Sequence, residues 1–153
     1  MIEFRNCITI DSPAGRVFDF LAAPENLPMW NYYIRRVEKL SPPKDGQGAL
    51  YHQVRKEDEQ TFRITDCVPA ERIEMVSTED SSPRFRRKFS LSEAGDSTEL
   101  VDDFELSTSY PALIEKITGN KVKKAVYDNL NKLKEILETG ETVLQDGRRV
   151  SIN

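Results

Sequence analysis

The hydrophobic pattern of the chain changes its period near residue 111, and this change constrains the fold more than any other feature. Residues 2–10 alternate apolar and polar side chains, and a period of two is typical of a strand with one buried face. From Pro111 to about Glu138, apolar residues recur at helical spacing, with lysines and glutamates between them. This second pattern predicts one long amphipathic helix.

Six further strands are expected between the first strand and the long helix. Turn-forming residues separate them, and Glu93 to Asp96 form a hairpin signal. Strands joined in sequence by tight turns form an antiparallel meander. The expected strands are residues 32–40, 49–56, 61–68, 72–77, 84–91 and 98–106.

Two short helical segments are expected between the first and second strands. Asp11 or Ser12 can cap the first segment, and Pro13 suits the first helical position. Pro24 ends this helix, and a second short helix or turn leads to Trp30. The predicted order is therefore one strand, two short helices, six strands and a long helix.

The expected sheet has one apolar face, and the expected helix has one apolar side. Both are buried when the helix lies across that face of the sheet. We therefore expect an α+β domain over residues 1–140. In it, a curved antiparallel sheet of about seven strands wraps around the long C-terminal helix. Gly140 is a suitable stop for that helix. Residues 141–153 are polar, and we expect a C-terminal tail that is free to be flexible.

Composition argues against several classes of protein. The chain has 153 residues, which fits one domain, and its formal net charge of -4 argues against a nucleic-acid partner. No stretch approaches the roughly 20 apolar residues that span a bilayer, and the N-terminus lacks the apolar segment of a signal peptide. We therefore expect a cytoplasmic protein without stable membrane insertion. Cys7, Cys67 and one histidine do not make a zinc-finger ligand set, and no cofactor motif is present, so neither metal nor cofactor is expected.

Several short motifs, taken in their order along the chain, resemble the SRPBCC superfamily of polyketide cyclases/dehydrases and START-related lipid-transfer proteins. The resemblance covers nearly the whole chain up to about Glu138 and implies a helix-grip fold. It leaves the function open, because this fold hosts many functions. The motifs are Pro13 to Leu21, Trp30, Ile64-Thr65-Asp66 before Pro69 and Arg72-Ile73, and Asn129 to Lys134.

Such a fold implies a cavity, because a strongly curved sheet cannot pack flush along the whole length of a straight helix. An apolar cavity with a few polar anchors suits lipids, isoprenoids or quinones, and polyketides. Strand parity and helical spacing indicate which residues face it. The candidate ligand-binding residues are Trp30, Tyr51, Phe85, Arg87, Phe89, Leu100, Asp102, Phe104, Val122 and Val126.

One pair of opposite charges is expected on the core face. A hairpin turn centred on residues 92–97 places Arg87 directly opposite Asp102, where the two side chains can touch. One interpretation is a structural ion pair that completes the sheet. The other is that Arg87 anchors a ligand carboxylate or phenolate while Asp102 holds the guanidinium in place.

His52 is the only histidine and the other candidate for proton transfer. A three-residue turn at residues 58–60 would place it opposite Asp66, and a His–Asp pair can be half of an acid–base device. The simpler interpretation is a cross-strand pair at the surface or rim. No Ser or Cys lies in a recognisable nucleophile motif.

Three functions are compatible with these observations. We favour noncatalytic binding or transport of a hydrophobic small molecule in the cavity. The alternative is a cyclase, aromatase or dehydrase that uses Arg87, Asp102, His52 and Tyr51 for acid–base chemistry. The third is a partner-binding or regulatory module that reports ligand occupancy through the long helix. Either a monomer or a dimer is compatible with the sequence, since the edge of the first strand could pair across a dimer.

Overall fold

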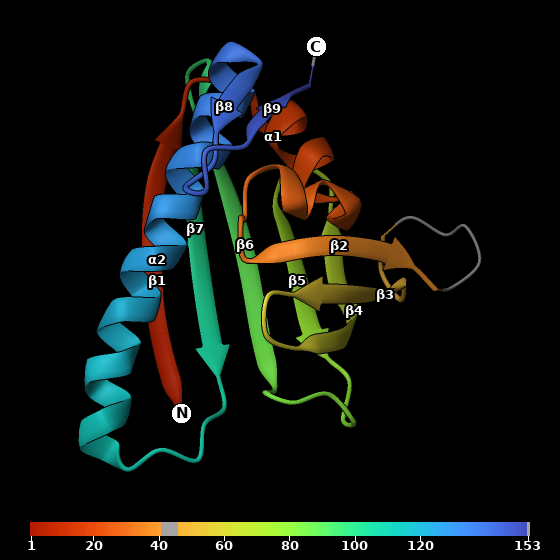
Figure 1. The fold of residues 1–153 in the computed structure, drawn as a ribbon. Coiled ribbons are helices and arrows are strands. Elements are labelled where there is room, and N and C mark those ends of the chain that lie inside the picture. Colours follow the sequence, from red (N-terminus) through yellow and green to blue (C-terminus); the bar gives the residue numbers. More distant parts are fainter. Residues whose placement is uncertain (41–45, 153) are drawn as a thin grey trace.

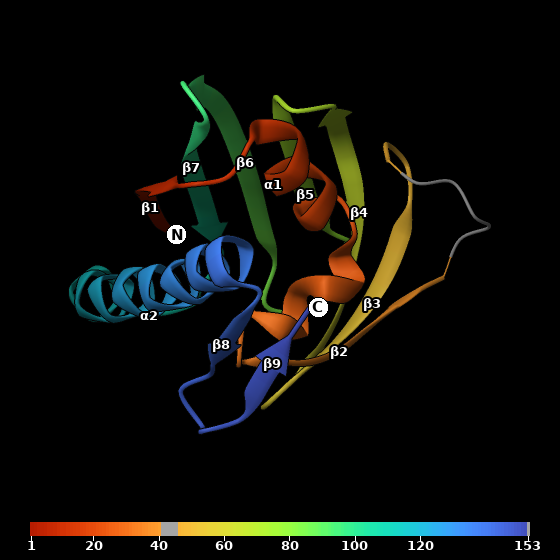
Figure 2. The same cartoon turned by 90° about the horizontal axis from the view of Figure 1, so that it is seen from above.

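Seven antiparallel strands form one curved sheet in the structure, a computed structural model that describes residues 1–40 and 46–152. The strand order is β1-β7-β6-β5-β4-β3-β2, and the sheet bends around helix α2 (Figure 1), as the view from above in Figure 2 also shows. This is the helix-grip fold. The strands are β1 (Ile2–Ile10), β2 (Ile34–Lys39), β3 (Leu50–Arg55), β4 (Glu59–Val68), β5 (Arg72–Ser77), β6 (Phe85–Ala94) and β7 (Ser97–Leu106). The helices are α1 (Ala14–Leu21), the 3-10 helix η1 (Pro24–Met29) and α2 (Ala112–Thr139).

The C-terminal half of α2 packs into the sheet and supplies much of the core. Its inward residues Leu130, Leu133 and Ile136 are fully buried among side chains of the inner sheet face. Farther toward its N-terminus the helix runs beside β1. A Cβ at Gly119 would lie 3.4 Å from Cγ2 of Ile2, which is van der Waals contact, so the helix and this strand lie close together here.

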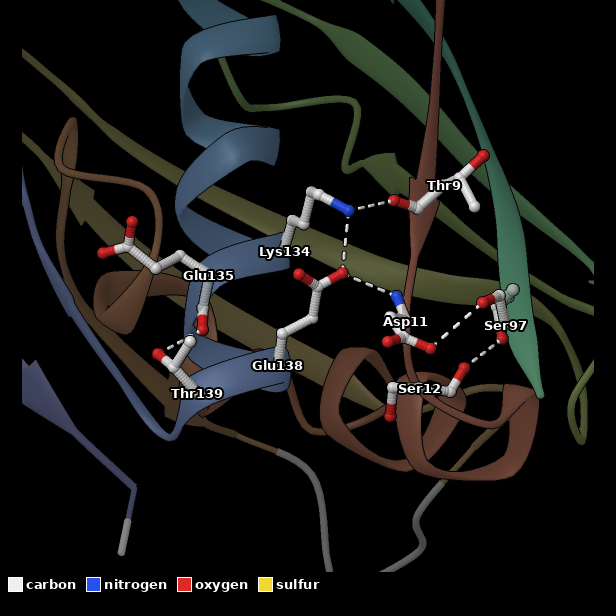
Figure 3. Close-up of polar contacts among 9 residues, drawn as sticks. Thr9, Asp11, Ser12, Ser97, Lys134, Glu135, Glu138 and Thr139 are labelled. Atoms are coloured by element: carbon white, nitrogen blue, oxygen red, sulfur yellow. Dashed lines mark hydrogen bonds and ion pairs between the residues drawn. The ribbon is translucent and has the colours of Figure 1, made fainter.

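Polar contacts fasten the C-terminal end of α2 to the end of β1 (Figure 3). The Nζ of Lys134 donates to the backbone carbonyl of Thr9 at 2.6 Å and pairs with Glu138 at 2.7 Å. The same carboxylate accepts the backbone N–H of Asp11 at 2.6 Å. The sequence had suggested Asp11 or Ser12 as the cap of α1. Neither side chain caps the helix, because Pro13 is the N-cap residue.

The β6–β7 hairpin turns one residue later than expected, and the predicted register was wrong by two residues. Gly95 adopts a φ of +67°, and only residues 95–96 connect the paired residues Ala94 and Ser97. Arg87 therefore lies opposite Phe104 instead of Asp102. A shift of two keeps every side chain on its face of the sheet, so the two charges still share the core face as diagonal neighbours.

Residues after Gly140 form a second, two-stranded sheet, where the sequence pattern had suggested a polar tail. Gly140 adopts a φ of +86°, and α2 ends there, as expected. Strands β8 (Glu141–Val143) and β9 (Arg149–Ser151) then pair, and Leu144 between them is buried. Within residues 1–40 and 46–152, no helix is long and apolar enough to cross a membrane.

Candidate ligand-binding cavity

A cavity of about 310 Å³ lies between the inner face of the sheet and the middle of α2. Strands β4 to β7 supply one apolar wall, and the helix supplies the other. The cavity begins where the helix stops packing directly on the sheet. The α2 residues that line it, such as Val122 and Ala125, are smaller and less deeply buried than the leucines of the C-terminal half. Its main apolar lining residues are Phe62, Met75, Phe85, Phe104, Val122 and Val126.

A row of aromatic rings crosses the inner face of the sheet, and its middle members, Phe62, Phe85 and Phe104, form the floor of the cavity. Ring centroids are 5.3 Å apart between Phe4 and Phe104, 6.4 Å between Phe104 and Phe85, and 6.0 Å between Phe85 and Phe62. Tyr51 extends the row, stacked on Phe62 at 5.5 Å. The strand register aligns these rings because Phe4 and Phe104 are direct cross-strand partners. The floor is therefore apolar, with the Phe85 and Phe104 rings nearly parallel and the Phe62 ring tilted by 58° from that of Phe85.

Arg87 and Asp102 form a buried, bidentate ion pair beside this floor. The Nε of Arg87 donates to Oδ1 of Asp102 at 3.0 Å, and Nη2 donates to Oδ2 at 2.6 Å. The side chains are 7% and 0% exposed. Arg87 lines the cavity, whereas Asp102 lies behind it. Among the described residues, the third guanidinium nitrogen, Nη1, has no hydrogen-bond partner, so both of its N–H groups are left to donate to another molecule.

Three aromatic rings surround the guanidinium of Arg87. Its Cζ lies 4.7 Å from the ring centre of Phe89, 5.4 Å from that of Trp30 and 5.5 Å from that of Phe104. Aromatic faces attract cations, and the effect increases when both partners are withdrawn from water. These rings hold the side chain in one orientation toward the cavity.

Two pairs of amide side chains complete the polar lining, and sequence reasoning did not find them. The Nε2 of Gln53 donates to Oε1 of Gln60 at 2.8 Å, across β3 and β4. The Nδ2 of Asn129 on α2 donates to Oδ1 of Asn31 at 3.2 Å. The alternation in β3 contained a signal, since Gln53 shares the inward face with Tyr51. The partner of each amide comes from another element, and that pairing depends on register and packing.

The more exposed part of the lining carries Tyr33, Arg55 and Lys121. A hydrogen bond with Tyr32, together with partial burial, raises the pKa of Tyr33 to about 12, so its hydroxyl stays protonated at neutral pH. The Nε of Arg55 lies 3.4 Å from Oδ1 of Asp58.

Five of the ten candidate ligand-binding residues line the cavity, and five lie in the core around it. Every residue of the second group is at most 1% exposed. They support the walls from behind and have no surface on the cavity. The lining residues are Phe85, Arg87, Phe104, Val122 and Val126, and the core residues are Trp30, Tyr51, Phe89, Leu100 and Asp102.

The predicted partner of His52 was wrong, although its expected place in a cross-strand pair at the surface agrees with the structure. The β3–β4 turn comes earlier than expected, and His52 is paired in register with Thr61. It lies on the outer face of the sheet, where its Nε2 is 3.3 Å from Oε2 of Glu59. Asp66, the expected partner, binds Arg72 instead. His52 therefore has no access to the cavity.

Comparison with known proteins agrees with this geometry. Residues 1–138 match the family of proteins described as polyketide cyclase / dehydrase and lipid transport. The chain belongs to this family. The resemblance to the SRPBCC superfamily is thereby confirmed. In the comparison with curated proteins, no match was found.

Solved structures share the fold at low sequence identity. A protein from Thermus thermophilus has a TM-score of 0.70 at 18% identity, over 88% of this chain and 96% of that one. A START superfamily protein from Mycobacterium smegmatis has a TM-score of 0.69 at 17% identity, over 88% and 98%. The di-domain ARO/CYC protein StfQ of the steffimycin biosynthetic pathway has a TM-score of 0.66 at 20% identity, over 88% and 44%.

Proposed function

We propose that the chain binds or carries a hydrophobic small molecule in this cavity and catalyses no reaction on it. The observation that supports the proposal is a cavity of about 310 Å³ with an aromatic floor and a mainly apolar surface. This volume is at the lower end of the range typical of small-molecule sites, roughly 300–1,000 Å³. Lipids, isoprenoids or quinones, and polyketide-like molecules fit such a lining.

Arg87 is the proposed polar anchor of the site. Asp102 matches its charge, so Nη1 can donate to a ligand oxygen without a bare cation being buried. The three rings around the guanidinium restrict its motion, and an ordered donor binds with a smaller loss of entropy.

A catalytic role would need a group that moves protons inside the cavity. The earlier candidates do not supply one, since His52 lies outside and Tyr51 has no cavity surface. Both oxygens of Asp102 accept hydrogen bonds from Arg87. This arrangement favours binding over a cyclase or dehydrase reaction that depends on these residues.

Native mass spectrometry of the purified protein, with solvent extraction of any bound molecule, tests the proposal. Ala125 lines the cavity, so Ala125→Phe should fill it and remove the co-purifying molecule. Ala112→Phe, at the exposed start of α2, is the matched control and should retain that molecule. Failure to bind any member of a lipid and polyketide panel would contradict the proposal.

The same spectra address two further proposals about the protein in the cell. We propose that the protein is located in the cytoplasm. The molecule that is extracted from the purified protein should then be a cytoplasmic metabolite. The oligomeric state, monomer or dimer, is read directly from the native mass.

A further inference from the structure

The ionisable side chains that line the cavity are all cationic, apart from the protonated hydroxyl of Tyr33. They are Arg55, Arg87 and Lys121, and no Asp or Glu of the described chain is among the lining residues. Asp102 matches the charge of Arg87 through two hydrogen bonds, and Asp58 lies 3.4 Å from Arg55. Lys121 has no ion-pair partner in residues 1–40 and 46–152. The cavity therefore has one positive charge that no carboxylate of the described residues balances.

This unbalanced charge lies at the exposed end of the lining. Lys121 is exposed, whereas Val126, about one helical turn farther along α2, is buried. Asp128 is the acidic residue nearest in sequence on this side of α2, and its carboxylate is bound to Nζ of Lys124 at 3.0 Å. The positive potential at the entrance is therefore not cancelled by a neighbour on the same helix.

We propose that the cavity selects a hydrophobic molecule that carries one anionic group, such as a carboxylate. The apolar body lies on the floor of Phe62, Phe85 and Phe104, and the anion is held at Lys121, with Arg55 as the second cation. Arg87, whose charge Asp102 already matches, remains the donor for an uncharged oxygen of a guest that has one. This inference rests on the proposed function, because it specifies the charge of the molecule that the cavity binds.

The physical reason is the unequal effect of Lys121 on three molecules that share one apolar tail. An anion gains attraction to the ammonium group, a neutral alcohol gains little, and a cation is repelled. Because Lys121 is exposed, water and salt screen the interaction, and one such pair changes affinity by about two- to fivefold.

Displacement of a neutral fluorescent reporter, phenylnaphthylamine, by decanoate, decanol and decylammonium at neutral pH tests the inference. We expect decanoate to displace it best and decylammonium least. Lys121→Gln should weaken decanoate about two- to fivefold and leave decanol unchanged. Lys121→Glu should place decylammonium ahead of decanoate. Raising the salt concentration should reduce the preference of the natural protein for decanoate.

Lys123→Gln is the matched control. It also removes one positive charge, two residues from Lys121, but the side chain of Lys123 does not line the cavity. It should leave the order of the three competitors intact. Equal displacement by all three in the natural protein would overturn the anion preference and leave hydrophobic binding in place. Absence of reporter binding would overturn the proposed function, and the inference with it.

Discussion

The two halves of helix α2 have the same hydrophobic periodicity, but the apolar face is buried in one half and exposed in the other. In the C-terminal half, Leu133 and Ile136 are fully buried in the core, and Figure 3 shows the polar contacts that fasten this end. In the N-terminal half, Leu113, Ile114 and Ile117 are 72%, 50% and 54% exposed. Figure 1 shows this half projecting past the sheet edge at β1. The cavity lies between the two regions.

This difference separates two uses of an amphipathic helix. The C-terminal half converts apolar burial into stability, at about 25 cal/mol per Å². The middle of the helix forms one wall of a space that the protein does not fill, so its apolar residues contribute less to folding and more to binding. Substitutions in the two regions should therefore affect different measurements.

The largest effect is expected where the sheet opposes the middle of the helix, at the buried ion pair. Arg87→Leu leaves the fully buried carboxylate of Asp102 without a partner, and we expect a loss of about 3–5 kcal/mol in the free energy of unfolding. Arg87→Leu combined with Asp102→Leu should recover most of it. Urea denaturation measures both. Weak ligand binding by a stable double variant would identify Arg87 as an anchor, and unchanged binding would make the pair purely structural.

The packed half of the helix should show the next largest effect. Leu133→Ala removes a fully buried side chain, and we expect a loss of about 2–5 kcal/mol in the free energy of unfolding. Leu113→Ala is the matched control in the exposed half, where we expect a change within about 0.5 kcal/mol. Equal losses in urea denaturation would show that the contrast between the halves is wrong.

A smaller gain is expected between the two halves, at Gly119. An alanine there improves helix propensity by up to about 1 kcal/mol. Its Cβ would meet Ile2 at 3.4 Å, which β1 can accommodate with little movement. We expect Gly119→Ala to raise the midpoint of thermal unfolding slightly. A lower midpoint would show that the close approach of α2 to β1 tolerates no added atom.

The smallest effects concern acid stability at the two ends of α2. Burial alone would raise the pKa of Glu138, but hydrogen bonds from Lys134 and the Asp11 backbone, together with the charge of Lys134, outweigh it and lower that pKa. At the other end, hydrogen bonds from the N-terminal amine of Met1 and from Thr108 lower the pKa of Glu115.

A carboxyl whose pKa is lower in the folded protein stabilises the fold above its unfolded pKa, near 4.5 for these residues, and loses this effect as the pH falls through its folded value. Thermal unfolding midpoints should therefore fall as the pH drops below about 4.5. Glu138→Gln and Glu115→Gln should each reduce that fall. Their effects should add, because the sites are far apart along the helix. An unchanged acid profile in both variants would contradict these contacts.

The arrangement of elements could be predicted from the sequence because it depends on periodicity. The apolar face of the sheet survived an error of two residues in the β6–β7 register, since side chains in a strand alternate with a period of two. Phe85, Arg87 and Phe104 therefore reached the cavity as expected, although their partners differ. The long helix was correct for the same reason, with bounds of Ala112 and Thr139.

Features that depend on turns and on contacts between distant elements could not be predicted. His52 was assigned the wrong partner because one turn was placed too late. The Asn31–Asn129 contact joins residues that no local pattern relates. The exposure of Ile114 and Ile117 could not be predicted from the sequence either, because periodicity identifies an apolar face without showing whether anything covers it.

The position of Trp30 gives the protein an intrinsic optical signal. It is the only tryptophan, and its indole lies 5.4 Å from the guanidinium carbon of Arg87. A bound molecule that accepts a hydrogen bond from Nη1 of Arg87 would alter the electric field at the indole without contacting the indole itself. Emission from unlabelled protein would then report occupancy of the site, and the Lys121 variants could be titrated without a dye.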